Sequence, residues 1–149
     1  MGKKTEITRH FVATVYVIHD NKVLLTFHKK IKKWLPPGGH IDENELPDEA
    51  ALREVKEETG LDVEIISDKE PRLSNIATPL HRPEFVQMED VDGHQHIDLL
   101  YLAVPKTHDL KISSESEDVR WFSLHEMKEN VPSEIRHHAN KMIKKLAKE

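Results

Sequence analysis

The segment from Pro47 to Gly60 constrains the fold more than any other part of this sequence. Proline is favoured in the first turn of a helix and glycine just past its last turn, so these two residues bracket a helix through DEAALREVKEET. The residues DVEII, which begin at Asp62, have the apolar and β-branched character of a strand. A helix that runs directly into a strand predicts an α/β chain in which the helix covers a sheet.

Strand patterns precede and follow this helix. Strands are predicted over 11–18, 23–29, 85–91, 96–104 and 118–122. The first two flank a turn at 19–22 and should form a hairpin. An amphipathic helix is predicted from Pro132 to Lys148, with its inward side formed by Ile135, Ala139, Met142, Ile143 and Leu146. Strands around one helix, with a second helix at the end, predict an α/β/α sandwich with a central mixed sheet.

The segment Trp34-Leu35-Pro36-Pro37-Gly38-Gly39 interrupts these patterns. Two prolines and two adjacent glycines are incompatible with a regular helix and require special backbone geometry. We therefore expect a tightly shaped loop between the hairpin and the helix at 47–60.

Composition limits the class of protein. The length of 149 residues suits one domain with its own core, so we expect a single domain over 1–149. There is no cysteine, so any metal must be held by oxygen or imidazole ligands, and no apolar run suggests a membrane partner or a signal peptide. We therefore expect a cytoplasmic protein.

The net charge of −5 disfavours a nucleic-acid polymer as partner, and an anionic substrate would need local cations or a metal. Monomer and homodimer remain alternatives.

The predicted helix concentrates carboxylates on one side. At about 100° per residue, Glu54, Glu57 and Glu58 fall within an arc of roughly 100°, with Arg53 at its edge. The opposite side is predicted to hold Ala51, Leu52, Val55 and Thr59. Repelling carboxylates near the negative end of a helix dipole need a compensating positive charge, and their hard oxygens suit Mg²⁺ or Mn²⁺. A solvated, charge-rich helix face is the alternative interpretation.

Residue spacing around the helix favours the metal site. From Gly39 the sequence has five residues, Glu45, seven residues and then REVKEETGL over 53–61. This pattern resembles the Nudix box, G-x5-E-x7-R-E-U-x-E-E-x-G-U, at every specified position. The N-terminal hairpin, the W-L-P-P-G-G-H segment and a late R-W-F segment before the last helix also resemble Nudix hydrolases, so the resemblance covers nearly the whole chain.

The resemblance implies a Nudix-type α/β/α sandwich and a divalent-metal-dependent pyrophosphohydrolase that uses Mg²⁺, with Mn²⁺ as the alternative. It implies that Glu54, Glu57 and Glu58 are metal ligands, that the Gly39 carbonyl is a further ligand, and that Arg53 orients the glutamates. In-line attack by water on a phosphoanhydride then needs positioned carboxylates and one base, and no covalent nucleophile.

The general base of this expected site has several candidates, because members of the family differ in the carboxylate that they use. We predict Glu57 as the base. The alternatives are Glu45, Glu115 and Glu117.

Weaker signals concern substrate binding. His96 shares a strand face with Asp98 and is a candidate contact to base or phosphate; a histidine metal site and a structural, hydrogen-bonded histidine are alternatives. Trp34 is a candidate for stacking on a base, and a core position is the alternative. The lysines between 29 and 33 either steer polyphosphate or form a solvated loop.

Three classes of function remain open. The small size favours a nucleoside triphosphate, ordinary or oxidised, that is cleaved to monophosphate and pyrophosphate. A nucleotide-sugar or ADP-ribose hydrolase is the alternative, but the proline that ADP-ribose enzymes tend to carry about fifteen residues past the box is replaced here by Asn75 and Ile76, with Pro79 slightly later. A non-catalytic Nudix-fold regulator would normally have lost box glutamates, and all of them are present.

Overall fold

The computed structural model describes residues 6–128 and 130–148, and its sheet is built around strand β1 (Arg9–His19). The partners of β1 are β2 (Lys22–His28), β4 (Gly38–His40) and β7 (His94–Pro105). β1 runs parallel to β7 and antiparallel to β2 and β4. The central mixed sheet that the sequence predicted is therefore confirmed.

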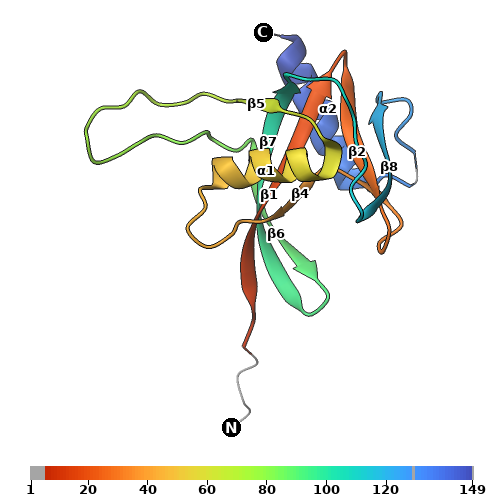
Figure 1. The fold of residues 1–149 in the computed structure, drawn as a ribbon, viewed down its shortest axis with the longest axis horizontal. Coiled ribbons are helices and arrows are strands. Elements are labelled where there is room, and N and C mark those ends of the chain that lie inside the picture. The colour runs from red at the N-terminus through yellow and green to blue at the C-terminus, as the bar shows by residue number, and fades with distance from the viewer. Residues whose placement is uncertain (1–5, 129, 149) are drawn as a thin grey trace.

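The outer strands extend the sheet on both sides of this centre. They are β3 (Trp34–Leu35), β5 (Val63–Ile66), β6 (Phe85–Val91) and β8 (Ser116–Phe122). β3 and β8 pair antiparallel with β2, whereas β5 and β6 pair antiparallel with β7. Residues 67–84 connect β5 to β6 as a long loop that projects away from the sheet in Figure 1.

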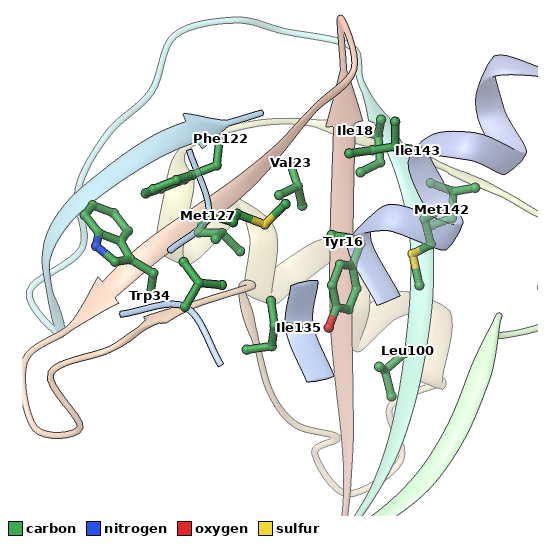
Figure 2. Close-up of a cluster of buried hydrophobic side chains, with 14 residues drawn as sticks. Tyr16, Ile18, Val23, Trp34, Leu100, Phe122, Met127, Ile135, Met142 and Ile143 are labelled. Carbon is green, nitrogen blue, oxygen red and sulfur yellow. The ribbon is translucent and has the colours of Figure 1, made fainter. Parts of the chain in front are cut away.

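Two helices, α1 (Pro47–Thr59) and α2 (Ser133–Ala147), cover opposite faces of the sheet (Figure 1). Successive residues of a strand point to opposite faces, so β1 contributes to two separate cores. Val15 and Val17 pack in the cluster that includes α1, whereas Tyr16 packs in the cluster that includes α2, where Figure 2 shows it beside that helix. The predicted α/β/α sandwich is confirmed. Neither helix is long and apolar enough to span a membrane within the part of the chain that the structure describes.

Backbone conformation explains where two of these elements end. Asp20 and Asn21 have φ of 49° and 59°, the left-handed conformations that a tight two-residue hairpin turn requires. Gly60 has φ of 81°, and its N–H donates to the Lys56 carbonyl oxygen at 3.0 Å, so it ends α1 as predicted.

The prediction of a loop over 34–39 is wrong for most of that segment. Trp34 and Leu35 form β3, and the two glycines belong to β4. Hydrogen bonds to neighbouring strands hold the segment extended, because Gly38 pairs with Thr14 of β1 and Trp34 pairs with Phe27 of β2. Proline excludes a helix but is compatible with an extended edge, so the composition alone did not distinguish loop from short strand.

One residue of the predicted inner side of α1 is also placed wrongly. Leu52 is 41 % exposed, whereas the other three residues predicted there are buried and Ala50 is buried with them. At about 100° per residue, Leu52 lies roughly 100° from Ala51, whereas Glu58 lies only about 20° from it. The acidic and apolar sides of α1 are therefore adjacent rather than opposite, and Glu58 is half-buried.

Candidate active site

The glutamates of α1 lie against the two glycines of β4. A Cβ atom on Gly39 would lie 2.5 Å from Glu54 Oε1, and a Cβ atom on Gly38 would lie 2.5 Å from the Ala13 carbonyl oxygen. The Gly38 N–H donates to Glu58 Oε2 at 2.7 Å. Glycine is therefore required here because the backbone approaches both a carboxylate and the neighbouring strand more closely than any side chain allows.

A polar cavity of about 440 Å³ opens beside this contact. Its walls come from β4, from α1 and from the segment before β8. The lining residues are Gly38, Gly39, His40, Asp42, Glu54, Glu57, Glu58, Ser113, Ser114 and Glu115. Four glutamates around one cavity create a strongly negative site in which a cation would be favoured.

Arg53 organises the carboxylates on the outer side of this cavity. Its Nε and Nη2 atoms donate to the two oxygens of Glu45 at 2.7 and 3.0 Å, a bidentate pair. Its Nη1 atom donates to Glu54 Oε1 at 2.9 Å and to Glu57 Oε2 at 3.2 Å, and Nη2 also donates to the His40 carbonyl oxygen at 3.0 Å. These hydrogen bonds, above all those with Glu45, raise the pKa of Arg53 above its usual value.

Burial makes the inner glutamates difficult to ionise in the absence of a cation. Desolvation raises the pKa of Glu58 to about 8, although the hydrogen bond from Gly38 opposes this shift. Repulsion by Glu54 and Glu115 adds to the increase. Desolvation also raises the pKa of Glu54, against the stabilising effect of Arg53. Arg53 therefore balances only part of the negative charge of these carboxylates. A divalent cation would balance the rest.

The donor chemistry of this site suits a hard divalent cation. Within residues 6–128 and 130–148, no three carboxylate or histidine side chains converge in a finished metal-binding arrangement. The reason is that Arg53 draws Glu54 and Glu57 toward itself, while Glu58 turns to the Gly38 amide. The Glu57 side chain is 58 % exposed, so it can rotate into the cavity beside the other two. Apart from His40, the side chains that line the cavity offer only oxygen ligands, as Mg²⁺ and Mn²⁺ prefer.

The structure separates the alternatives for the general base. Glu57 and Glu115 both line the cavity. Glu45 has both oxygens bonded to Arg53, which lowers its pKa, and it faces a different cavity. Glu117 pairs with Lys32 at 2.6 Å. Geometry therefore favours Glu57 or Glu115, and it favours a positioning role for Glu45 through Arg53.

The two residues proposed for substrate contact have different surroundings. Trp34 is 6 % exposed and packs against Phe27 and Phe122, which favours the core alternative over stacking on a base. His96 is half-buried on the α2 face of the sheet, with His94 Nε2 at 3.1 Å from its Nε2 atom. A substrate contact by His96 stays a prediction.

Sequence reasoning missed part of the cavity wall. Asp42, Ser113 and Ser114 contribute to the lining. The two serines come from the segment before β8, and the Lys29 ammonium fixes that segment by donating to the Ser114 carbonyl oxygen at 2.6 Å. The only available signal was the pair of acids at 115 and 117, because a loop contact across the fold leaves no periodic pattern in the sequence.

Known proteins resemble this chain along most of its length. The family model of the NUDIX domain matches residues 8–146. An asymmetrical bis(5'-nucleosyl)-tetraphosphatase of Rattus norvegicus is 30 % identical over 79 % of this chain and 74 % of its own. A Lactococcus lactis subsp. cremoris protein, provisionally named a DHNTP pyrophosphohydrolase, is 32 % identical over 60 % of this chain and 51 % of its own. A NUDIX-family hydrolase structure from Clostridium perfringens has a TM-score of 0.82 and 34 % identity, covering 94 % of this chain and 99 % of that chain.

Proposed function

Because the chain belongs to the Nudix family of hydrolases, we propose that it is a Mg²⁺-dependent pyrophosphohydrolase that converts a nucleoside triphosphate to monophosphate and pyrophosphate. The observation that carries the proposal is the cavity in which Glu54, Glu57 and Glu58 meet the Gly38–Gly39 backbone. Nudix hydrolases generally use divalent metal ions, and these oxygen donors fit such an ion.

The residues that line or adjoin the cavity would have different tasks in this reaction. A divalent cation held by the α1 glutamates and the Gly39 carbonyl would supply Lewis-acid polarisation of the phosphate oxygens. Glu57 would accept the proton of the water that attacks phosphorus, and pyrophosphate would leave from the opposite side. Arg53, fixed by Glu45, would hold Glu54 and Glu57 at the correct spacing and keep its charge throughout.

Two relatives support the reaction class and suggest different substrates. The name of the Lactococcus lactis protein specifies pyrophosphate chemistry on DHNTP, which agrees with the proposed cleavage. The Rattus norvegicus relative, which matches a larger share of this chain, is named for bis(5'-nucleosyl) tetraphosphates. Asymmetric cleavage of such a dinucleotide is therefore the second candidate function.

A product-resolved screen tests both candidates. Purified protein with Mg²⁺ at mildly alkaline pH would be offered ordinary and oxidised nucleoside triphosphates, nucleotide sugars, ADP-ribose and dinucleoside tetraphosphates, and the products would be separated by anion-exchange chromatography. We expect monophosphate and pyrophosphate from a triphosphate. Cleavage of the tetraphosphate in preference to every triphosphate would instead establish the second candidate. Binding without turnover of any compound would contradict both and favour a regulatory role.

A further inference from the structure

A second cavity, of about 320 Å³, lies on the α2 face of the sheet. Thr14 and Tyr16 of β1, together with Leu100 of β7, form its floor, and Leu35 and Ile135 contribute apolar walls. Figure 2 shows Tyr16, Leu100 and Ile135 in the same region, close to α2. The volume falls within the ~300–1,000 Å³ typical of small-molecule sites, and apolar walls suit a flat heterocycle.

The second cavity and the glutamate cavity are lined by neighbouring residues of one short backbone segment. Pro36 lines the second cavity, and Gly38 and Gly39 line the first. Two to three extended residues span roughly 7–10 Å, which suits a ribose and one phosphate. A nucleotide with its phosphates among the glutamates can therefore place its base in the second cavity.

The second cavity contains a buried carboxyl group with a free acceptor. Asp98 is 4 % exposed, and its Oδ2 atom accepts a hydrogen bond from the Thr14 hydroxyl at 3.0 Å. Its Oδ1 atom is buried and has no hydrogen-bond partner. Glu89, from the neighbouring strand β6, lies close enough to Asp98 to raise the pKa of that carboxyl group, and its Oε2 atom accepts a hydrogen bond from Gln87 Nε2 at 2.7 Å. A buried polar atom without a partner is costly, so Oδ1 is a candidate acceptor for a donor group on a molecule bound in this cavity.

We propose that this cavity binds the base of the substrate and that Asp98, with Glu89, selects a ring edge on which an amino group lies beside a ring N–H, as in guanine and pterins. The proposal rests on the function proposed above. Such an edge places a ring N–H beside an amino N–H, which gives two adjacent donors for two carboxyl oxygens. Adenine places an acceptor nitrogen beside its amino group, so one carboxyl oxygen would face another acceptor and stay unpaired.

Electrostatics agrees with this assignment. Burial, followed by the contact with Glu89, raises the pKa of Asp98 to about 8, and Glu134, which also lines the cavity, adds to the increase. At neutral pH Asp98 is therefore mostly protonated, and a proton directed toward Glu89 leaves the outward oxygens as acceptors. It also limits the charge of the pair, which would otherwise repel the phosphates of the ligand.

Binding of monophosphates without added metal tests the base cavity separately from catalysis. Isothermal titration calorimetry of the whole protein should give a Kd for dGMP about tenfold or more below that for dAMP, the effect of one buried polar group left unpaired. Asp98→Asn keeps the shape and should abolish the preference, and Glu89→Gln should reduce it in the same direction. Asp48→Asn is the matched control, because Asp48 Oδ1 is also buried without a partner but lies outside this cavity. This variant should keep the preference.

Turnover measurements then distinguish a guanine nucleotide from a pterin as the substrate that carries this edge. We would compare kcat/KM for dGTP, 8-oxo-dGTP, dihydroneopterin triphosphate and dATP; the first three share the edge, and the best of them identifies a guanine or a pterin substrate. Asp98→Asn should act mainly on KM. Equal binding of dGMP and dAMP, or an unchanged preference in folded Asp98→Asn and Glu89→Gln, overturns the base assignment. A dGMP preference without cleavage of any triphosphate leaves the base assignment standing and contradicts the proposed reaction.

Discussion

Two groups of carboxylates, on different parts of the same sheet, have opposite surroundings. Glu54, Glu57 and Glu58 lie along a polar cavity beside an arginine and backbone amides. Asp98 and Glu89 lie in a mostly apolar cavity beside a threonine hydroxyl and a glutamine amide. The first group has more negative charge than its one arginine balances, whereas the second can share a proton. Identical chemical groups thus favour a cation in one place and a hydrogen-bond donor in the other.

The largest expected effect comes from removing divalent metal. Carboxylates alone cannot polarise a phosphoanhydride, so activity should vanish in excess chelator and return with Mg²⁺. Binding of dGMP to the second cavity should persist in chelator, because no metal is needed there. The measurements are product release and calorimetry on the same sample. Full activity in excess chelator would exclude the metal mechanism, and loss of dGMP binding would show that the two cavities are not independent.

A substitution on the apolar side of α1 would create a carboxylate with neither of these surroundings. Val55→Asp would place a charge at a fully buried position that has neither an arginine nor a proton-sharing partner. The free energy of unfolding should fall by about 3–5 kcal/mol, and activity should fall with it. Leu52→Asp is the control on the same helix, because Leu52 is 41 % exposed and should tolerate the charge within about 0.5 kcal/mol. Chemical denaturation of both variants checks this; equal losses would contradict the observed orientation of α1.

Removing one charge from the first group should separate catalysis from stability. Glu57→Gln should lower kcat by a factor of roughly 10² or more, the scale of a lost base or electrostatic contact. Its melting temperature should stay equal or rise slightly, because repulsion at the negative end of the helix is relieved. Glu64→Gln, at an exposed position of β5, is the matched control and should change neither quantity. If folded Glu57→Gln kept full activity, the base would have to be sought at Glu115.

The two groups also differ in how far the sequence predicts them. Glu54, Glu57 and Glu58 follow one helix and one motif, so local periodicity and spacing were enough to bring them together. Asp98 and Glu89 come from adjacent antiparallel strands, with Thr14 reached through a parallel pairing to β1. Strand register is a property of the whole sheet, and the sequence gives no spacing rule for it. His96 drew attention to this strand face, but not to the buried carboxyl group beside it.

Errors within the predicted elements have the same origin. The buried stripe of α1 was assigned from residue type, and Leu52 was placed inside because it is apolar. The structure instead buries Ala50 and leaves Glu58 only partly exposed, with its Oε2 atom accepting a hydrogen bond from the Gly38 N–H. Likewise, composition showed that 34–39 could not be helical, but pairing with β1 and β2 makes parts of it strands.

The smallest expected effect is a difference in the pH dependence of stability. The pKa of Asp98 is raised from 3.8 to about 8 by folding, chiefly through burial, so the folded state binds more protons than the unfolded state between those values. The contribution of this proton to the free energy of unfolding is fully present below about pH 4, is lost as the pH rises toward 8, and no longer changes above that pH.

The melting temperature in chelator should therefore fall between pH 5 and 8. Asp98→Asn should flatten this slope and be more stable by roughly 5 °C at pH 8. Glu58, with its pKa also near 8, and Glu54, whose pKa is raised too, give slopes of the same sign in the metal-free protein, so Asp98→Asn should keep a residual slope that Glu58→Gln reduces. Parallel curves for the wild-type protein and Asp98→Asn would mean that Asp98 is ionised in the folded state, and the carboxyl pair would then not share a proton.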